Sequence, residues 1–144
     1  MKIKVYIADD HAMFRDGIKA MLSAENQFEI VGEGDEENSI LSDCKNLQPD
    51  VVLMDISMKD TDGVEVTRKL RSVNSDVKIL AVSMHNEGQY IKSMLDNGAN
   101  GYILKSTGRN EMMTAIKTVY DGATFLSNEV SQNLLKGLNT PAGQ

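Results

Sequence analysis

The chain is poor in the residues on which disulfides, zinc sites and membrane spans depend. Its 144 residues include one cysteine, two histidines, two prolines and no tryptophan. The single cysteine, Cys44, excludes an internal disulfide and is typical of a reducing compartment, so we expect a cytoplasmic protein. No apolar run approaches the ~18 residues of a membrane span. Lys4 interrupts the first apolar run, which argues against a signal peptide. We therefore expect no membrane contact.

The charge balance is acidic, which narrows the range of partners. The chain has 15 basic and 21 acidic residues, for a formal net charge of −6 at pH 7. This charge disfavours nonspecific binding to DNA, RNA or an anionic membrane surface, and it leaves binding to another protein open. The length corresponds to one domain with a sizeable core.

Apolar runs of strand length alternate with segments of helical period. This alternation predicts an α/β fold of the flavodoxin-like type, a five-stranded parallel sheet with helices on both faces. A short helix over residues 129–138 and a flexible end over residues 139–144 are expected to follow. The predicted strands are 3–8, 28–34, 51–55, 77–83 and 101–104, and the predicted helices are 13–24, 39–47, 64–73, 89–96 and 111–120.

Five polar residues stand where the apolar runs stop. Asp9 and Asp10 follow the first strand, and Asp55 closes the third. Ser83 ends the fourth strand, and Lys105 follows the fifth. Because ligands of open α/β sheets bind at the carboxyl edge of the strands, these residues are expected to form one site.

The chemistry of these groups favours a hard cation and a phosphoryl group. Two carboxylates ~4 Å apart repel by about 4 kcal/mol at an effective dielectric of 20, so a cluster of three must bind protons or a cation. Oxygen ligands suit Mg²⁺, and the Cys/His set that zinc prefers is missing nearby. Lys105 and Ser83 could hold phosphoryl oxygens, with Asp55 as the nucleophile. The alternative for Asp9 and Asp10 is a turn with a helix N-cap.

Several short motifs occur in a fixed order along the chain: Asp9-Asp10-His11, residues 49–55 (PDVVLMD), Asp62-Gly63, Ser83 and residues 98–105 (GANGYILK). With these motifs, residues 2–120 resemble the receiver domain of two-component response regulators, a CheY-like fold. A second set, Arg15-x-Gly17-Ile18, residues 101–105 and residues 125–127 (FLS), is similar to the NarL/FixJ type of this family.

The resemblance implies a role for each residue of the site. Asp55 would be the phosphoacceptor, phosphorylated by a sensor histidine kinase. Asp10 would bind Mg²⁺ directly and Asp9 through water, with Asp55 and the backbone carbonyl of Ser57 as further ligands. The domain would catalyse only its own phosphotransfer and dephosphorylation, so we do not expect an enzyme.

The resemblance also implies a switch and an output. Phosphorylation would draw the hydroxyl of Ser83 toward the phosphoryl group, and Tyr102 would turn inward. This change would reshape the face formed by the fourth helix, fifth strand and fifth helix. The alternative for Tyr102 is a half-buried strand aromatic with its hydroxyl at the surface.

In the NarL/FixJ type a LuxR-type helix-turn-helix follows the receiver and binds DNA. We expect residues 1–122 to be the receiver and 123–144 to be a linker segment, in a chain cut from a longer regulator. DNA binding would then need an output domain outside this chain, and a homodimer formed on phosphorylation is an expected partner.

The sequence departs from the common pattern of the family at two positions. Lys59 stands where many such domains have a proline, which predicts a less constrained loop. Ser106 follows Lys105 in place of a common cis-proline, and we expect a trans bond because a cis bond before a non-proline costs ~3–4 kcal/mol.

His11 is interpreted as structural, and His85 as an exposed loop residue or one that tunes water access. The alternative functions are a stand-alone receiver that acts by protein contact and a phosphohydrolase with an aspartyl-phosphate intermediate.

Overall fold

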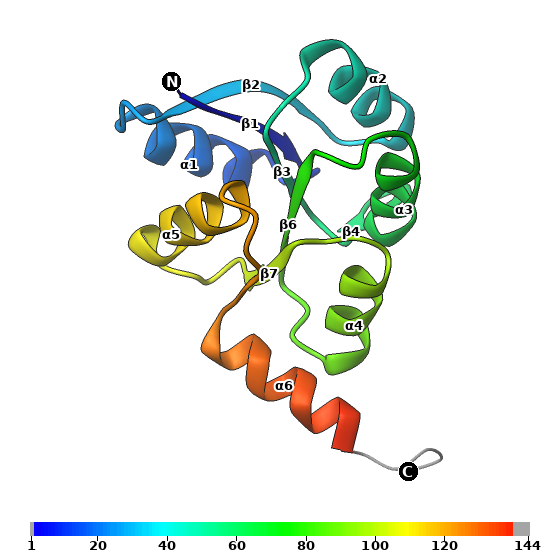
Figure 1. Ribbon diagram of the computed structural model, residues 1–144. Coiled ribbons are helices and arrows are strands. Elements are labelled where there is room, and N and C mark those ends of the chain that lie inside the picture. Colours follow the sequence, from blue (N-terminus) through cyan, green and yellow to red (C-terminus); the bar gives the residue numbers. More distant parts are fainter. Residues whose placement is uncertain (1, 140–144) are drawn as a thin grey trace.

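The computed structural model describes residues 2–139, with side chains through residue 136. These residues form a central sheet, a short hairpin and helices that pack on the sheet (Figure 1). The strands of the central sheet are β1 (Ile3–Ala8), β2 (Phe28–Gly34), β3 (Val51–Met54), β6 (Lys78–Ser83), β7 (Gly101–Leu104) and β8 (Phe125–Leu126), and the hairpin consists of β4 (Ser57–Met58) and β5 (Thr61–Asp62). The helices are α1 (Ala12–Ser23), α2 (Glu37–Leu47), α3 (Gly63–Val73), α4 (Gly88–Asp96), α5 (Arg109–Tyr120) and α6 (Asn128–Asn139).

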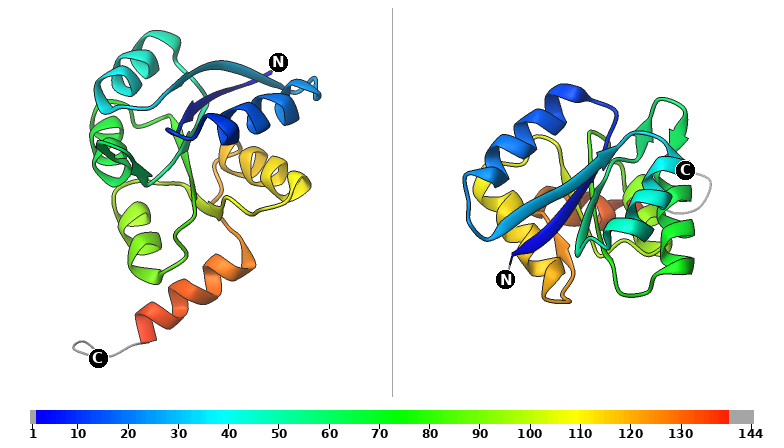
Figure 2. Two further views of the ribbon diagram at one scale, coloured as in Figure 1. Left: turned by 180° about the vertical axis from the view of Figure 1, so that it is seen from behind. Right: turned by 90° about the horizontal axis from the view of Figure 1, so that it is seen from above.

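The central sheet is parallel throughout, in the order β2-β1-β3-β6-β7-β8. Helices cover both of its faces, with α1 and α5 on one face and α2, α3 and α4 on the other (Figure 2). The period of two along each strand divides the core accordingly. Ile7 and Leu53 pack toward α1 and α5, and their neighbours Tyr6 and Met54 pack toward α2, α3 and α4. The predicted α/β fold is confirmed.

The predicted number of strands is wrong by one, because β8 adds a sixth strand to the sheet. Phe125 pairs with Gly101, and Leu126 pairs with Tyr102. A Cβ at position 101 would lie 2.6 Å from the Phe125 carbonyl oxygen, so the glycine permits this approach. A strand of two residues is too short to show a hydrophobic period, and it forms here only because β7 offers a free edge.

The helices begin one or two residues before the hydrophobic period predicts, and at α2 and α3 a capping side chain sets the first turn. The Glu36 side chain accepts a hydrogen bond from the Ser39 N–H at 2.9 Å and starts α2. Asp62 accepts from the Val64 N–H at 2.9 Å and starts α3. At the other end of the chain, residue 139 belongs to α6, and residues 140–144 of the predicted flexible end lie outside the described residues.

α6 packs against α4 and β7 (Figure 1). Its residue Val130 is fully buried in the same apolar cluster as Tyr102 and Leu104. The first turns of α6 are therefore part of the folded core. The division into a receiver over residues 1–122 and a linker over residues 123–144 stays a prediction. None of the described helices is long and apolar enough to cross a membrane.

Candidate functional site

The ends of β1 and β3 bring two carboxylates together. Ala8 and Met54 are paired in register, and the Asp55 N–H donates to the Ala8 carbonyl at 2.9 Å. Asp9 and Asp55 therefore leave neighbouring strands at one edge, where their side chains are only 2% and 3% exposed. The strand order changes direction between β1 and β3, and open α/β sheets bind their ligands at such a position.

Lys105 supplies a cation between these two carboxylates. Its Nζ lies 2.8 Å from Asp9 Oδ2 and 3.2 Å from Asp55 Oδ2. The ammonium also lies 4.8 Å from the ring centroid of Phe14, within cation–π distance. No cis peptide bond occurs in the described chain, so the bond from Lys105 to Ser106 is trans as expected. The lysine thus reaches the site from a trans peptide.

Burial makes the ionised form of Asp55 costly. Desolvation raises the pKa of this carboxyl above its ordinary value, and the charge of Asp9 raises it further. Lys105 and a long hydrogen bond from the Ser57 N–H, 3.4 Å from Asp55 Oδ1, act in the opposite direction. A cation beside Asp55 would therefore stabilise the ionised form of its carboxyl.

Gly63 allows α3 to begin directly against the backbone of Asp55. The Gly63 N–H donates to the Ile56 carbonyl at 2.7 Å, and a Cβ at position 63 would overlap the carbonyl oxygen of Asp55. Together with the Asp62 cap, this contact shows that α3 begins at Gly63, directly after the hairpin. The glycine has the further task of fixing the position of Asp55.

Asp10 holds the loop that follows β3. Its Oδ2 accepts a hydrogen bond from the Lys59 N–H at 2.6 Å, and the same loop carries the β4–β5 hairpin. The loop is therefore more constrained than the absence of a proline predicts. A proline at position 59 could not donate this bond because it has no N–H.

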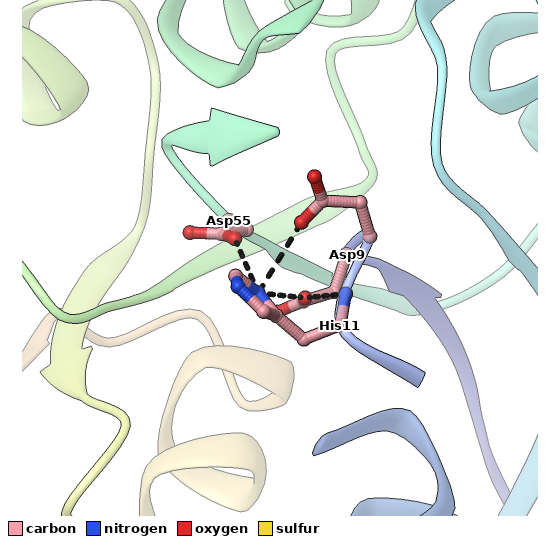
Figure 3. A group of neighbouring side chains, drawn as sticks. Asp9, His11 and Asp55 are labelled. Carbon is pink, nitrogen blue, oxygen red and sulfur yellow. Dashed lines mark hydrogen bonds and ion pairs between the residues drawn. The ribbon is translucent and has the colours of Figure 1, made fainter. Parts of the chain in front are cut away.

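His11 is a part of the site that sequence reasoning treated as structural. Its Nδ1 lies 3.1 Å from Asp9 Oδ1, 3.2 Å from Asp10 Oδ1 and 3.8 Å from Asp55 Oδ2. Lys105 Nζ lies 2.9 Å from the same nitrogen. Figure 3 shows dashed lines from the carboxylates of Asp9 and Asp55 to this imidazole. The sequence signal was its place directly after the two aspartates, but contact with Asp55 and Lys105 depends on the tertiary fold.

The residues at this edge fit a divalent cation. One ligand atom from each of Asp9, Asp10, His11 and Asp55 lies within 4.8 Å of the others. Asp10 Oδ1 is buried, and among the buried side-chain oxygens and nitrogens of the described residues it is the one without a hydrogen-bond partner. A buried carboxylate oxygen without a donor is a ready ligand for a hard cation such as Mg²⁺.

Ser83 lies at the same edge but is engaged elsewhere. It is fully buried, and its Oγ accepts a hydrogen bond from the His85 N–H at 3.0 Å. Among the described residues no hydrogen bond joins this hydroxyl to Asp55 or Lys105. Ser83 and Lys105 do line one surface pocket of about 430 Å³, which Glu129 of α6 also borders.

Tyr102 is buried, with its hydroxyl turned inward. The hydroxyl donates to the His85 carbonyl at 2.6 Å, and desolvation raises the pKa of the phenol. The alternative of a half-buried aromatic with a surface hydroxyl is therefore wrong. His85 itself is half-buried, since its ring stacks on Tyr90 and its Nε2 lies 3.0 Å from Ser57 Oγ.

The chain matches one family model and several curated proteins. The model, described as the response regulator receiver domain, matches residues 5–117. The transcriptional regulatory protein DegU of Brevibacillus brevis is 38% identical over 135 residues, which cover 94% of this chain and 57% of DegU. The response regulator GacA of Pseudomonas syringae is 38% identical over 132 residues, which cover 92% of this chain and 62% of GacA. The chain thus spans less than two thirds of the length of these relatives.

A solved structure agrees with the family match. The signal receiver domain of the putative response regulator NarL from Mycobacterium tuberculosis superposes with a TM-score of 0.80 at 34% identity. The superposition covers 84% of this chain and 98% of that domain. Sequence and structure therefore lead to the same family.

Proposed function

The chain belongs to the family of response regulator receiver domains, and we propose that it is a phosphorylation switch of a two-component system. A sensor histidine kinase transfers a phosphoryl group to Asp55, and the change controls a DNA-binding output domain. The observation that carries this proposal is a buried carboxylate, Asp55, 3.2 Å from the ammonium of Lys105 at the sheet edge. The similarity to DegU, a transcriptional regulatory protein, supports the output.

The transfer joins a carboxylate oxygen of Asp55 to phosphorus and breaks the bond from phosphorus to the kinase imidazole. The electron pair of that bond stays with the imidazole nitrogen. Lys105 then faces the new phosphoryl oxygens, whose charge it stabilises. Its second partner, Asp9 Oδ2 at 2.8 Å, keeps the ammonium in place while its bond to Asp55 is lost.

Mg²⁺ would be held by Asp10, Asp55 and the backbone carbonyl of Ser57, with Asp9 acting through water. When bound, it would neutralise charge on the phosphoryl oxygens and on the carboxylates. The buried Asp10 Oδ1, which has no hydrogen-bond partner, supports the direct role of Asp10. Both oxygens of Asp9 already have partners, the His11 N–H and Lys105, which supports an indirect role for Asp9.

The switch runs through the backbone of His85. The His85 N–H is bound to the hydroxyl of Ser83, and the His85 carbonyl is bound to the hydroxyl of Tyr102. If Ser83 turned toward a phosphoryl group on Asp55, the His85 amide would lose its acceptor. The loop between β6 and α4 would then be released, and the contact with Tyr102 would change with it.

Helix α6 lies next to the elements that this change would move. α6 packs on α4 and β7, and its Val130 shares an apolar cluster with Tyr102. A shift of Tyr102 or α4 would alter the packing of α6 and hence the position of any domain that follows it. A homodimer on phosphorylation is proposed as the active form, with a cytoplasmic location that suits the single buried Cys44.

The family match favours signalling over the phosphohydrolase alternative. Proteins of this family are signalling proteins rather than enzymes in the ordinary sense. We therefore expect one phosphoryl group per chain and no sustained turnover of a phosphate ester. A stand-alone receiver would share the same site and would differ only in its output.

Intact mass after incubation with acetyl phosphate and Mg²⁺ tests the proposal. The wild type should gain one phosphoryl group, and Asp55→Asn should gain none. Asp60→Asn, which removes an exposed acid from the neighbouring loop, should behave as the wild type does. A wild type without an adduct, or an adduct that persists in Asp55→Asn, contradicts the proposal.

A further inference from the structure

The imidazole of His11 reaches into the carboxylate cluster, and the proposed function gives it no task. We propose that His11 Nδ1 is a direct ligand of the divalent cation at this site. The site then takes first-row transition ions such as Mn²⁺ with a preference over Mg²⁺ that depends on His11. This inference rests on the proposed cation site formed by Asp10 and Asp55.

The contact with Lys105 indicates that His11 Nδ1 acts as an acceptor. An ammonium has three N–H donors and no acceptor, so the 2.9 Å contact from Lys105 Nζ directs it to the lone pair of Nδ1. The nitrogen then has no proton to donate to Asp9 or Asp10, whose oxygens lie 3.1 and 3.2 Å away. One ring nitrogen cannot satisfy both kinds of neighbour. A cation among them can, because the lone pair and the carboxylates would all face it.

The separations match those of ligands that share one ion. Bonds of about 2.0–2.1 Å in an octahedral shell put neighbouring ligand atoms about 3 Å apart and opposite ones about 4.2 Å apart. The distances from Nδ1 to the oxygens of the two proposed carboxylate ligands, Asp10 and Asp55, are 3.2 and 3.8 Å. The four candidate ligand atoms lie within 4.8 Å of one another. Little rearrangement is needed to enclose an ion.

The ring can adjust to such an ion. His11 precedes α1, its side chain makes no capping hydrogen bond, and it is 57% exposed. Its backbone N–H donates to Asp9 Oδ1 at 2.8 Å, and this turn brings the ring back over the cluster. The backbone turn therefore places the ring over the cluster, and the exposed side chain has room to adjust.

A nitrogen ligand changes which ions the site prefers. Mg²⁺ favours oxygen ligands and keeps several waters. Mn²⁺ also suits carboxylate and water ligands, but as a first-row transition ion it accepts an imidazole more readily than Mg²⁺ does. Removing the imidazole should therefore cost Mn²⁺ more affinity than it costs Mg²⁺. Loss of a ligand should weaken Mn²⁺ binding at least about tenfold, as the loss of an outer-shell partner does.

Electron spin echo measurements on Mn²⁺ bound to the unphosphorylated chain test the inference. The wild type should show modulation from a directly bound ¹⁴N nucleus, and His11→Ala should lose it together with most of the Mn²⁺ affinity. His11→Asn, which keeps a residue favoured at a helix start, checks that the loss is not a folding defect. His85→Ala removes the other histidine of the chain and should keep the nitrogen signal.

The outcomes separate this inference from the proposed function. Mn²⁺ that binds without a nitrogen signal, and that is lost in Asp10→Asn, overturns the role of His11 and leaves the cation site intact. Tighter Mn²⁺ binding in His11→Ala means that the ring blocks the site, which also overturns the inference. If Mn²⁺ does not bind the wild type at all, both the inference and the cation site are wrong.

Discussion

The backbone of Asp55 and the α-carbon of Gly63 are in direct contact, so that α3 begins against the residue that we propose as the phosphoacceptor. A Cβ at position 63 would overlap the Asp55 carbonyl oxygen and crowd the Ile56 backbone. The neighbours are backbone atoms at the end of a buried strand, which cannot move aside as a flexible side chain can. The smallest side chain at position 63 must therefore displace Asp55.

Gly63→Ala should destabilise the fold by roughly 1–3 kcal/mol, as overpacking does in a filled core, and should slow phosphorylation of Asp55. Urea unfolding and the rate of phosphorylation by acetyl phosphate measure the two effects. Gly17→Ala is the matched control, because no atom lies within 4 Å of the added Cβ. Position 17 lies within α1, so this control should gain up to about 1 kcal/mol. Equal effects of the two substitutions would contradict the account.

Asp55 should make stability fall as pH rises. Its pKa is raised in the folded state, first by burial and then by the charge of Asp9. The protonated form is therefore favoured by folding, and this contribution is complete below the unfolded pKa of about 3.9 and is lost as pH rises through the folded pKa. Asp55→Asn removes the loss, so it should be more stable than the wild type near pH 7, with a gap that closes toward about pH 4. Urea unfolding across this range measures the gap, and a constant gap would count against the account.

Tyr102→Phe should loosen the loop between β6 and α4 and leave the acceptor site intact. The variant loses the bond from the tyrosine hydroxyl to the His85 carbonyl, at a cost of about 0.5–1.5 kcal/mol. Faster amide hydrogen exchange at His85 and Asn86, with unchanged phosphorylation by acetyl phosphate, is the expected result. Tyr90→Phe is a useful control, since Tyr90 contacts the His85 ring and not its backbone. Unchanged exchange in Tyr102→Phe would show that the bond does not hold the loop.

Val130→Ala should loosen α6. The side chain is fully buried beside Tyr102 and Leu104, so its truncation should cost about 2 kcal/mol and speed amide exchange in α6. Leu135→Ala is the comparison, because Leu135 lies in the same helix but is 57% exposed. This second substitution should stay within about 0.5 kcal/mol of the wild type. Similar effects at both positions would show that α6 is not seated on Val130.

The gathering of four polar residues at one edge of the sheet could be predicted from sequence because strand ends are strong signals. Asp9, Asp55, Ser83 and Lys105 each follow an apolar run, and parallel strands place such ends at one edge of the sheet. Their order along the chain also carried the family resemblance. The Lys105 ammonium reaches Asp9 and Asp55 with Ser106 in place of a proline, a position that this departure from the family pattern left open.

Other features depend on contacts that no local pattern records. The imidazole of His11 contacts Lys105 across 94 residues of chain, and β8 pairs with the edge of β7 where Gly101 leaves room for Phe125. Gly63 stood out only as part of a family motif, and its contact with Asp55 depends on how α3 docks. The burial of Tyr102 likewise requires the helices that cover that face.

Borohydride trapping of the phosphorylated chain tests the central claim most directly. An acyl phosphate is reduced to an alcohol, so an aspartyl phosphate becomes homoserine, and the position of the change can be read by peptide mass spectrometry. After treatment with acetyl phosphate and Mg²⁺, the account predicts homoserine at position 55 and unchanged aspartates at positions 9 and 10. Homoserine at Asp9 or Asp10, or a phosphorylated chain with Asp55 unreduced, would contradict it.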